Sequence, residues 1–201
     1  AAGTGAWQVH WHMARYRRER GANGPALEAL RQAMLAADAA GADADARARM
    51  AIDLADLLLR LGLRPEGLEV AQTAATATAE ATLTILSDML FHHNLWQEAQ
   101  QVLEHNLRRH PDSATACWNL AHLLAESWQL QPALRLLDRA EALGPQPGAR
   151  AMRASLAARG GEVEAALRLY REVAEAEGAH SSAASSAAMA ARICWASPLV
   201  L

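Results

Sequence analysis

The sequence predicts an all-α protein: a right-handed α-solenoid of about five antiparallel helical hairpins followed by a terminal helix. The first observation is an internal sequence repeat: residues 83–111 resemble residues 117–145, 34 positions further along the chain. A fixed period with apolar positions in step is typical of a solenoid, in which each unit buries its face against its neighbours. The second is that prolines and glycines recur at the expected helix boundaries. The third is that no long stretch alternates apolar and polar residues, as a strand would.

This internal repeat predicts the two clearest hairpins, at about residues 80–111 and 113–145. Apolar and proline positions fall on one another in the two copies. These pairs are Leu86 with Leu120, Leu90 with Leu124, Ala99 with Ala133, Leu103 with Leu137 and Pro111 with Pro145.

Weaker copies extend this pattern in both directions. Upstream, the same phases predict hairpins at about residues 7–40 and 43–78, and downstream they predict one at about 148–177. A segment rich in serine and alanine, about 180–194, predicts a terminal helix. Residues 1–201 are therefore expected to form a single domain of helical repeats.

Prolines and glycines support these boundaries independently. Proline is tolerated in the first turn of a helix and disrupts its interior. Pro25, Pro65 and Pro132 occur where second helices are expected to begin. Between paired helices, where a left-handed residue is commonly needed, the sequence has Gly21, Gly62 and Gly161.

Composition excludes several classes of function. The net charge of −3 offers no basic stripe for nucleic acid. No apolar run reaches the length of a membrane span, so we expect no membrane insertion and a cytoplasmic protein. Cys117 and Cys194 lack the spacing of a metal site and are expected to be buried, reduced thiols.

The repeat resembles the tetratricopeptide repeat (TPR) family, whose 34-residue unit is a pair of antiparallel helices. The family's small residue in the first helix corresponds to Ala55, Ser87, Ala121 and Ala154. Its alanine early in the second helix corresponds to Ala26, Ala99, Ala133 and Ala166, with Gly67 in the second copy. Its large apolar residue four positions later corresponds to Leu30, Leu103, Leu137 and Tyr170, and to the smaller Ala71.

This resemblance implies a concave groove lined by the first helices of successive hairpins. The groove residues it implies are Asp53, Asp56 and Arg60; Ile85, Asp88, Phe91 and His92; Trp118, Asn119, His122 and Glu126; and Met152, Ser155 and Arg159. Asn119 could hold the main chain of a peptide, because a carboxamide offers both a donor and an acceptor. Trp118 offers a large apolar contact surface. For both residues, an ordinary structural role remains the alternative.

Two histidine–carboxylate pairs stand out within this set. Asp88 and His92 are four residues apart on one expected helix, and His122 and Glu126 are four apart on the next first helix. Residues at this spacing share a helix face. A metal site is one interpretation, and paired charges on a solvated face are the favoured one; we expect no metal and no cofactor.

The sequence therefore predicts a protein–protein interaction scaffold that binds a peptide or partner protein along its groove. The partner-binding residues expected are Asn119, Trp118, His122, Glu126, Asp88, His92 and Asp56. The acidic groove favours a partner with basic character, and self-association is a further expectation. The chain carries no catalytic motif, so it is not expected to be an enzyme. The alternative is an N-terminal recognition or structural arm of a larger bacterial enzyme, such as a glycosyltransferase or other transferase.

Overall fold

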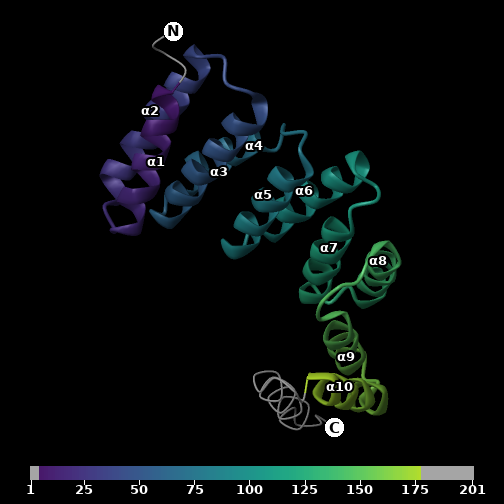
Figure 1. Cartoon of the computed structure of the whole chain (residues 1–201). Coiled ribbons are helices and arrows are strands. Elements are labelled where there is room, and N and C mark those ends of the chain that lie inside the picture. Colours follow the sequence, from purple (N-terminus) through teal and green to yellow (C-terminus); the bar gives the residue numbers. More distant parts are fainter. Residues whose placement is uncertain (1–4, 178–201) are drawn as a thin grey trace. The chain divides into compact units, whose positions relative to one another are not determined.

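A computed structural model describes residues 5–177, and within this range the chain forms ten α-helices and no strand (Figure 1). The chain divides into two compact units, Ala1–Pro111 and Asp112–Leu201. The predicted terminal helix at 180–194 and Cys194 lie outside the described residues.

The first unit contains three antiparallel helical hairpins. They are α1 (Ala6–Glu19) with α2 (Asn23–Ala39), α3 (Ala44–Arg60) with α4 (Arg64–Ala74), and α5 (Glu80–His92) with α6 (Trp96–Arg109). Helix α3 packs against both α2 and α5, so consecutive hairpins are stacked.

The second unit contains two hairpins in its described part. They are α7 (Ala114–Glu126) with α8 (Leu130–Leu143), and α9 (Ala149–Arg159) with α10 (Val163–Glu177). Helix α9 packs against α8 as well as against its partner α10. The prediction of an all-α fold built from about five hairpins is therefore confirmed.

Helix starts follow from local chemistry. The Asp43 side chain accepts a hydrogen bond from the Ala46 amide at 2.8 Å and caps α3. The Ser113 hydroxyl does the same for the Ala116 amide of α7 at 2.9 Å. Each side chain satisfies a backbone N–H that has no partner within its own helix. Pro65 lies in the first turn of α4, where its missing N–H costs nothing.

The turns inside the hairpins use a left-handed residue. Gly21, Gly62 and Gly161 have φ of 72°, 79° and 81°, as predicted from their positions. In the two remaining hairpins this conformation falls on Asn94 (φ 57°) and Trp128 (φ 59°). Asparagine tolerates the left-handed region better than other residues with a Cβ, whereas tryptophan has no such advantage.

Small side chains let the paired helices of the first unit approach closely. Ala26 and Ala99, both completely buried, occupy the second helices where the repeat pattern expects alanine. The equivalent residue of α4 is Gly67, where an added Cβ would lie 2.8 Å from Leu59 Cγ. Helix α4 buries only Gly67, Ala71 and Ala74, so it contributes little side-chain volume to the core.

The core of the second unit is built in the same way. Leu123, Leu137 and Leu156 are almost completely buried beside the alanines of their helices. Cys117 is buried among them as a free thiol. Burial raises the pKa of this thiol, and the charge of Arg139 offsets only part of that effect. Cys117 is therefore an unreactive core residue rather than a nucleophile.

Candidate functional site on the first helices

The first helices of the second unit, α7 and α9, frame a cavity of about 240 Å³. Three predicted groove residues of α7 line it, namely Trp118, His122 and Glu126. Met152 and Ser155 of α9, predicted as groove residues of the next repeat, line the opposite side. The structure thus brings five of the predicted residues around one cavity. It combines apolar surface from Trp118 and Met152 with polar groups from the other three.

Gly148 shapes one end of this cavity. It has φ of 85° and precedes α9, so it is in a conformation that favours glycine. A Cβ at this position would lie 3.7 Å from the indole ring of Trp118. The half-buried Trp118 ring therefore packs against bare main chain and contributes its surface to the cavity wall.

Glu126 is already ion-paired within the second unit. The Arg159 guanidinium donates to Glu126 Oε1 at 2.8 Å and to the main-chain oxygen of Ala125 at 2.5 Å. The same guanidinium lies 5.5 Å from the centre of the Trp128 ring. These contacts join the turn after α7 to the end of α9, so Arg159 holds adjacent hairpins together rather than standing free in a groove.

Asn119 is half-buried on α7 and does not line the cavity that Trp118 and His122 share. The Asn119 residue makes an interaction within the protein. Its predicted role as a peptide-binding carboxamide stays a prediction.

The first helices of the first unit carry a network of charged and polar side chains centred on Asp56 of α3. Arg60 Nε donates to both carboxylate oxygens of Asp56 at 3.0 Å, and Arg18 of α1 lies 3.3 Å away. His93, just after α5, donates from Nε2 to Asp56 Oδ1 at 2.8 Å, because a carboxylate only accepts. Asp56 therefore links all three hairpins of this unit.

Opposing effects determine the ionisation of Asp56. Burial alone would raise its pKa, but the hydrogen bonds from His93 and Arg60 and the charges of Arg60 and Arg18 lower it below the usual value. The carboxylate is stabilised as an anion at neutral pH. A partner would have to compete with three internal basic groups to reach it.

Three further polar contacts join the first helices of this unit. The indole N–H of Trp11 on α1 donates to Asp53 Oδ2 of α3 at 2.6 Å, and Arg18 lies 3.4 Å from Asp53 Oδ1. At the other end of α3, the Thr82 hydroxyl of α5 donates to Asp45. The predicted groove residues Asp53 and Asp56 thus belong to interhelical bridges that the sequence pattern did not reveal.

Asp88 and His92 are both exposed on α5. His92 Nδ1 donates to the main-chain oxygen of Asp88 at 2.6 Å, so the ring is held by the backbone. The four side chains considered for a metal site fall in two different units, Asp88 and His92 in the first and His122 and Glu126 in the second. Among residues 5–177, no group of three or more His, Cys, Asp or Glu side chains is placed to hold a metal ion.

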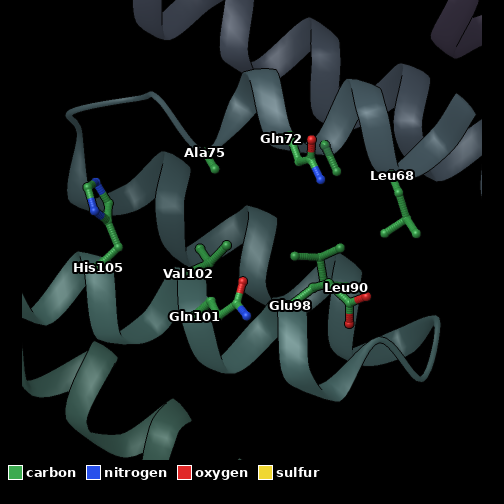
Figure 2. Close-up of a pocket in the computed structure, with 9 residues that line it drawn as sticks. Leu68, Gln72, Ala75, Leu90, Glu98, Gln101, Val102 and His105 are labelled. Carbon is green, nitrogen blue, oxygen red and sulfur yellow. The ribbon is translucent and has the colours of Figure 1, made fainter. Parts of the chain in front are cut away.

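A second cavity, lined mainly by second helices, was not anticipated from the sequence. It is about 290 Å³ and lies between α4 and α6, the second helices of adjacent hairpins in the first unit (Figure 2). The one signal in the sequence was Ala71, which stands where other repeats carry leucine or tyrosine.

Comparisons with known proteins give a match in structure but not in sequence. No protein-family model matches the chain, and neither does any curated protein sequence. The structure is similar to MamA 41-end from Desulfovibrio magneticus RS-1, with a TM-score of 0.65 and 17% identity over 90% of this chain and 100% of that one.

Two further solved structures extend this likeness. A tetratricopeptide repeat protein from Parabacteroides merdae ATCC 43184 has a TM-score of 0.67 and 15% identity, over 86% of this chain and 67% of that one. TPR-like repeats of a putative kinesin light chain from Podosopora anserina have a TM-score of 0.65 and 19% identity, over 90% of this chain and 100% of theirs. At such identities the likeness is one of fold, so the TPR resemblance seen in the sequence is confirmed as a TPR-like helical repeat fold.

None of the helices within residues 5–177 combines the length and the apolar character needed to cross a membrane.

Proposed function

We propose that this chain is a protein-interaction scaffold that binds a peptide or a segment of a partner protein on the first helices of its second unit. The observation that carries the proposal is the cavity lined by Trp118, His122 and Glu126 of α7 together with Met152 and Ser155 of α9. An aromatic ring beside a thioether and a few polar groups is the chemistry of a side-chain pocket at a protein interface.

The charge of the partner is not specified by this cavity. Glu126 is paired with Arg159, and Asp53 and Asp56 of the first unit are paired with arginines as well. These ion pairs leave fewer unpaired carboxylates than the sequence suggests. The proposal therefore places an apolar side chain of the partner against Trp118 and Met152, and hydrogen-bonding groups near His122 and Ser155.

The test uses peptides selected from a random display library against the whole chain. Trp118→Ala is expected to weaken the selected peptide by at least about tenfold, because a central tryptophan commonly carries much of the binding energy. Leu143→Ala is the control: it removes a large, partly exposed apolar side chain from the same unit, at a residue that does not line the cavity.

His122→Ala tests the same cavity with less risk of unfolding the chain, because His122 is exposed whereas Trp118 is half-buried. It is expected to weaken the same peptide while leaving the melting temperature nearly unchanged. Selected peptides that bind Trp118→Ala and His122→Ala as tightly as the unaltered chain would rule out this site.

A further inference from the structure

The cavity between α4 and α6 has an apolar floor. Ala71 of α4, Leu90 of α5 and Val102 of α6 form this floor, and all three are buried. Ala71 lines the cavity at the repeat position where α2, α6 and α8 carry Leu30, Leu103 and Leu137, so its side chain fills less of this space than leucine would. A small residue at a position that is elsewhere large leaves space that no neighbouring side chain fills.

Polar side chains surround this floor from both walls. Figure 2 shows Gln72 on one helix, and Glu98, Gln101 and His105 on the other. None of these four side chains makes a hydrogen bond or ion pair within the described part of the chain. Gln72 and Gln101 are exposed, so the cavity opens to solvent along the gap between the helices.

Charge is distributed unevenly along the cavity. Glu98 carries the one permanent charge among the lining residues, and it lies toward the end marked by Leu68 and Leu90 (Figure 2). His105 lies toward the opposite end, which is the end nearer to Ala75 (Figure 2). A cationic group would therefore be drawn to the Glu98 end, with two glutamine amide oxygens available as further acceptors.

We propose that this cavity binds an arginine side chain of a partner protein. The methylene stem of arginine would cover the apolar floor of Ala71 and Val102, as such stems do on protein surfaces. The planar guanidinium would donate to the Glu98 carboxylate and to the amide oxygens of Gln72 and Gln101. A cavity of 290 Å³ is at the small end of the range for cofactor sites, which suits a single side chain better than a whole cofactor.

The experiment is a titration of the isotope-labelled whole chain, followed by NMR, with N-acetyl-arginine amide as the probe. Saturable shifts are expected for the methyl groups of Leu68, Leu90 and Val102. N-acetyl-citrulline amide has nearly the same shape without the charge, and it is expected to cause much smaller shifts. Free arginine carries an additional ammonium and carboxylate, and it is expected to bind no more tightly than the blocked form.

Variants then assign the interaction to the cavity. Glu98→Gln is expected to weaken the probe by about tenfold, since it removes the charge-assisted hydrogen bonds. Glu69→Gln is the matched control, because Glu69 is on α4 but does not line the cavity. Ala71→Leu fills the floor and is expected to abolish binding while leaving the fold intact, as leucine occupies this position in three other repeats.

Several results would overturn the proposal. They include an absence of saturable shifts at the methyl groups of Leu68, Leu90 and Val102, equal binding of the citrulline probe, and equal weakening by Glu98→Gln and Glu69→Gln. Tighter binding of free arginine would also overturn it, by indicating a small-molecule site. This cavity belongs to the first unit and the peptide site to the second, so each proposal can fail without the other.

Discussion

Asp56 illustrates at the residue scale how a side chain on the first-helix face is committed to the protein's own structure. Its side chain is only 14% exposed and receives hydrogen bonds or ion pairs from Arg18, Arg60 and His93. A partly buried carboxylate in such a network is stabilising only while it remains ionised. The stability of the first unit is therefore expected to depend on pH through this residue.

Asp56→Asn is expected to lower the free energy of unfolding by about 2 kcal/mol at neutral pH, because it removes charge-assisted hydrogen bonds. The folded-state pKa of Asp56 is lowered, so its contribution to stability is fully present above the ordinary aspartate pKa of 3.8 and is lost as pH falls through the folded pKa. The difference between variant and unaltered chain should shrink as pH falls below about 4.

Urea unfolding at several pH values measures this difference. Asp38→Asn is the control, because Asp38 is 62% exposed and its pairing with Arg47 at 3.5 Å is a surface contact. Its effect is expected to stay below about 0.5 kcal/mol at every pH. A loss for Asp56→Asn that does not change with pH would contradict the role given to the ionised carboxylate.

At the element scale, the turn between α7 and α8 departs from the rule that the other hairpins follow. Glycine holds the left-handed position in three turns and asparagine in a fourth, whereas Trp128 holds it here with φ of 59°. The side chain is 67% exposed, so core packing does not explain its conformation. The contact with Arg159 offsets part of the backbone cost.

Two separate substitutions of Trp128 distinguish the effect of backbone strain from that of the side-chain contact. Trp128→Ala loses the Arg159 contact and keeps a Cβ, so it is expected to be slightly destabilising. Trp128→Gly loses the same contact but relieves the left-handed strain, so it should be more stable than the alanine variant by about 1 kcal/mol. Thermal unfolding gives the order, and an alanine variant at least as stable as the glycine variant would exclude strain at this turn.

At the scale of the whole molecule, the division into two compact units bears on how the chain unfolds. In stacked repeats each hairpin contacts only its neighbours, so a mutation that destabilises one hairpin need not destabilise distant ones. Leu57 in the first unit and Leu123 in the second are matched probes, because both are leucines of first helices and are at most 2% exposed.

Leu57→Ala and Leu123→Ala are each expected to cost about 3 kcal/mol, because each leaves a cavity in a packed core. Hydrogen exchange followed by mass spectrometry should show lost protection mainly in α1–α6 for the first variant and in α7–α10 for the second. A uniform loss of protection along the whole chain in both variants would instead support a single domain over residues 1–201. That single domain stays a prediction from the sequence.

The helices and turns of this protein were predictable because their causes are local. Proline in a first turn, glycine in a left-handed turn and alanine at a close helix contact act on their immediate neighbours, so the repeat pattern reveals them. The resemblance to the TPR family also implied that Trp118, His122, Met152 and Ser155 face one groove, and the structure brings them around one cavity.

The sequence by itself therefore determined the all-α hairpin architecture and the faces on which candidate site residues lie. Only the tertiary structure decided which of those side chains are ion-paired within the protein, as Asp53, Asp56 and Glu126 are. It also decided where a cavity is left, as beside Ala71. The physical reason is that hydrogen bonds such as Trp11–Asp53, His93–Asp56 and Arg159–Glu126 join residues 33 to 42 positions apart. A periodic pattern specifies a face, but pairing and empty volume depend on which side chains meet across stacked helices.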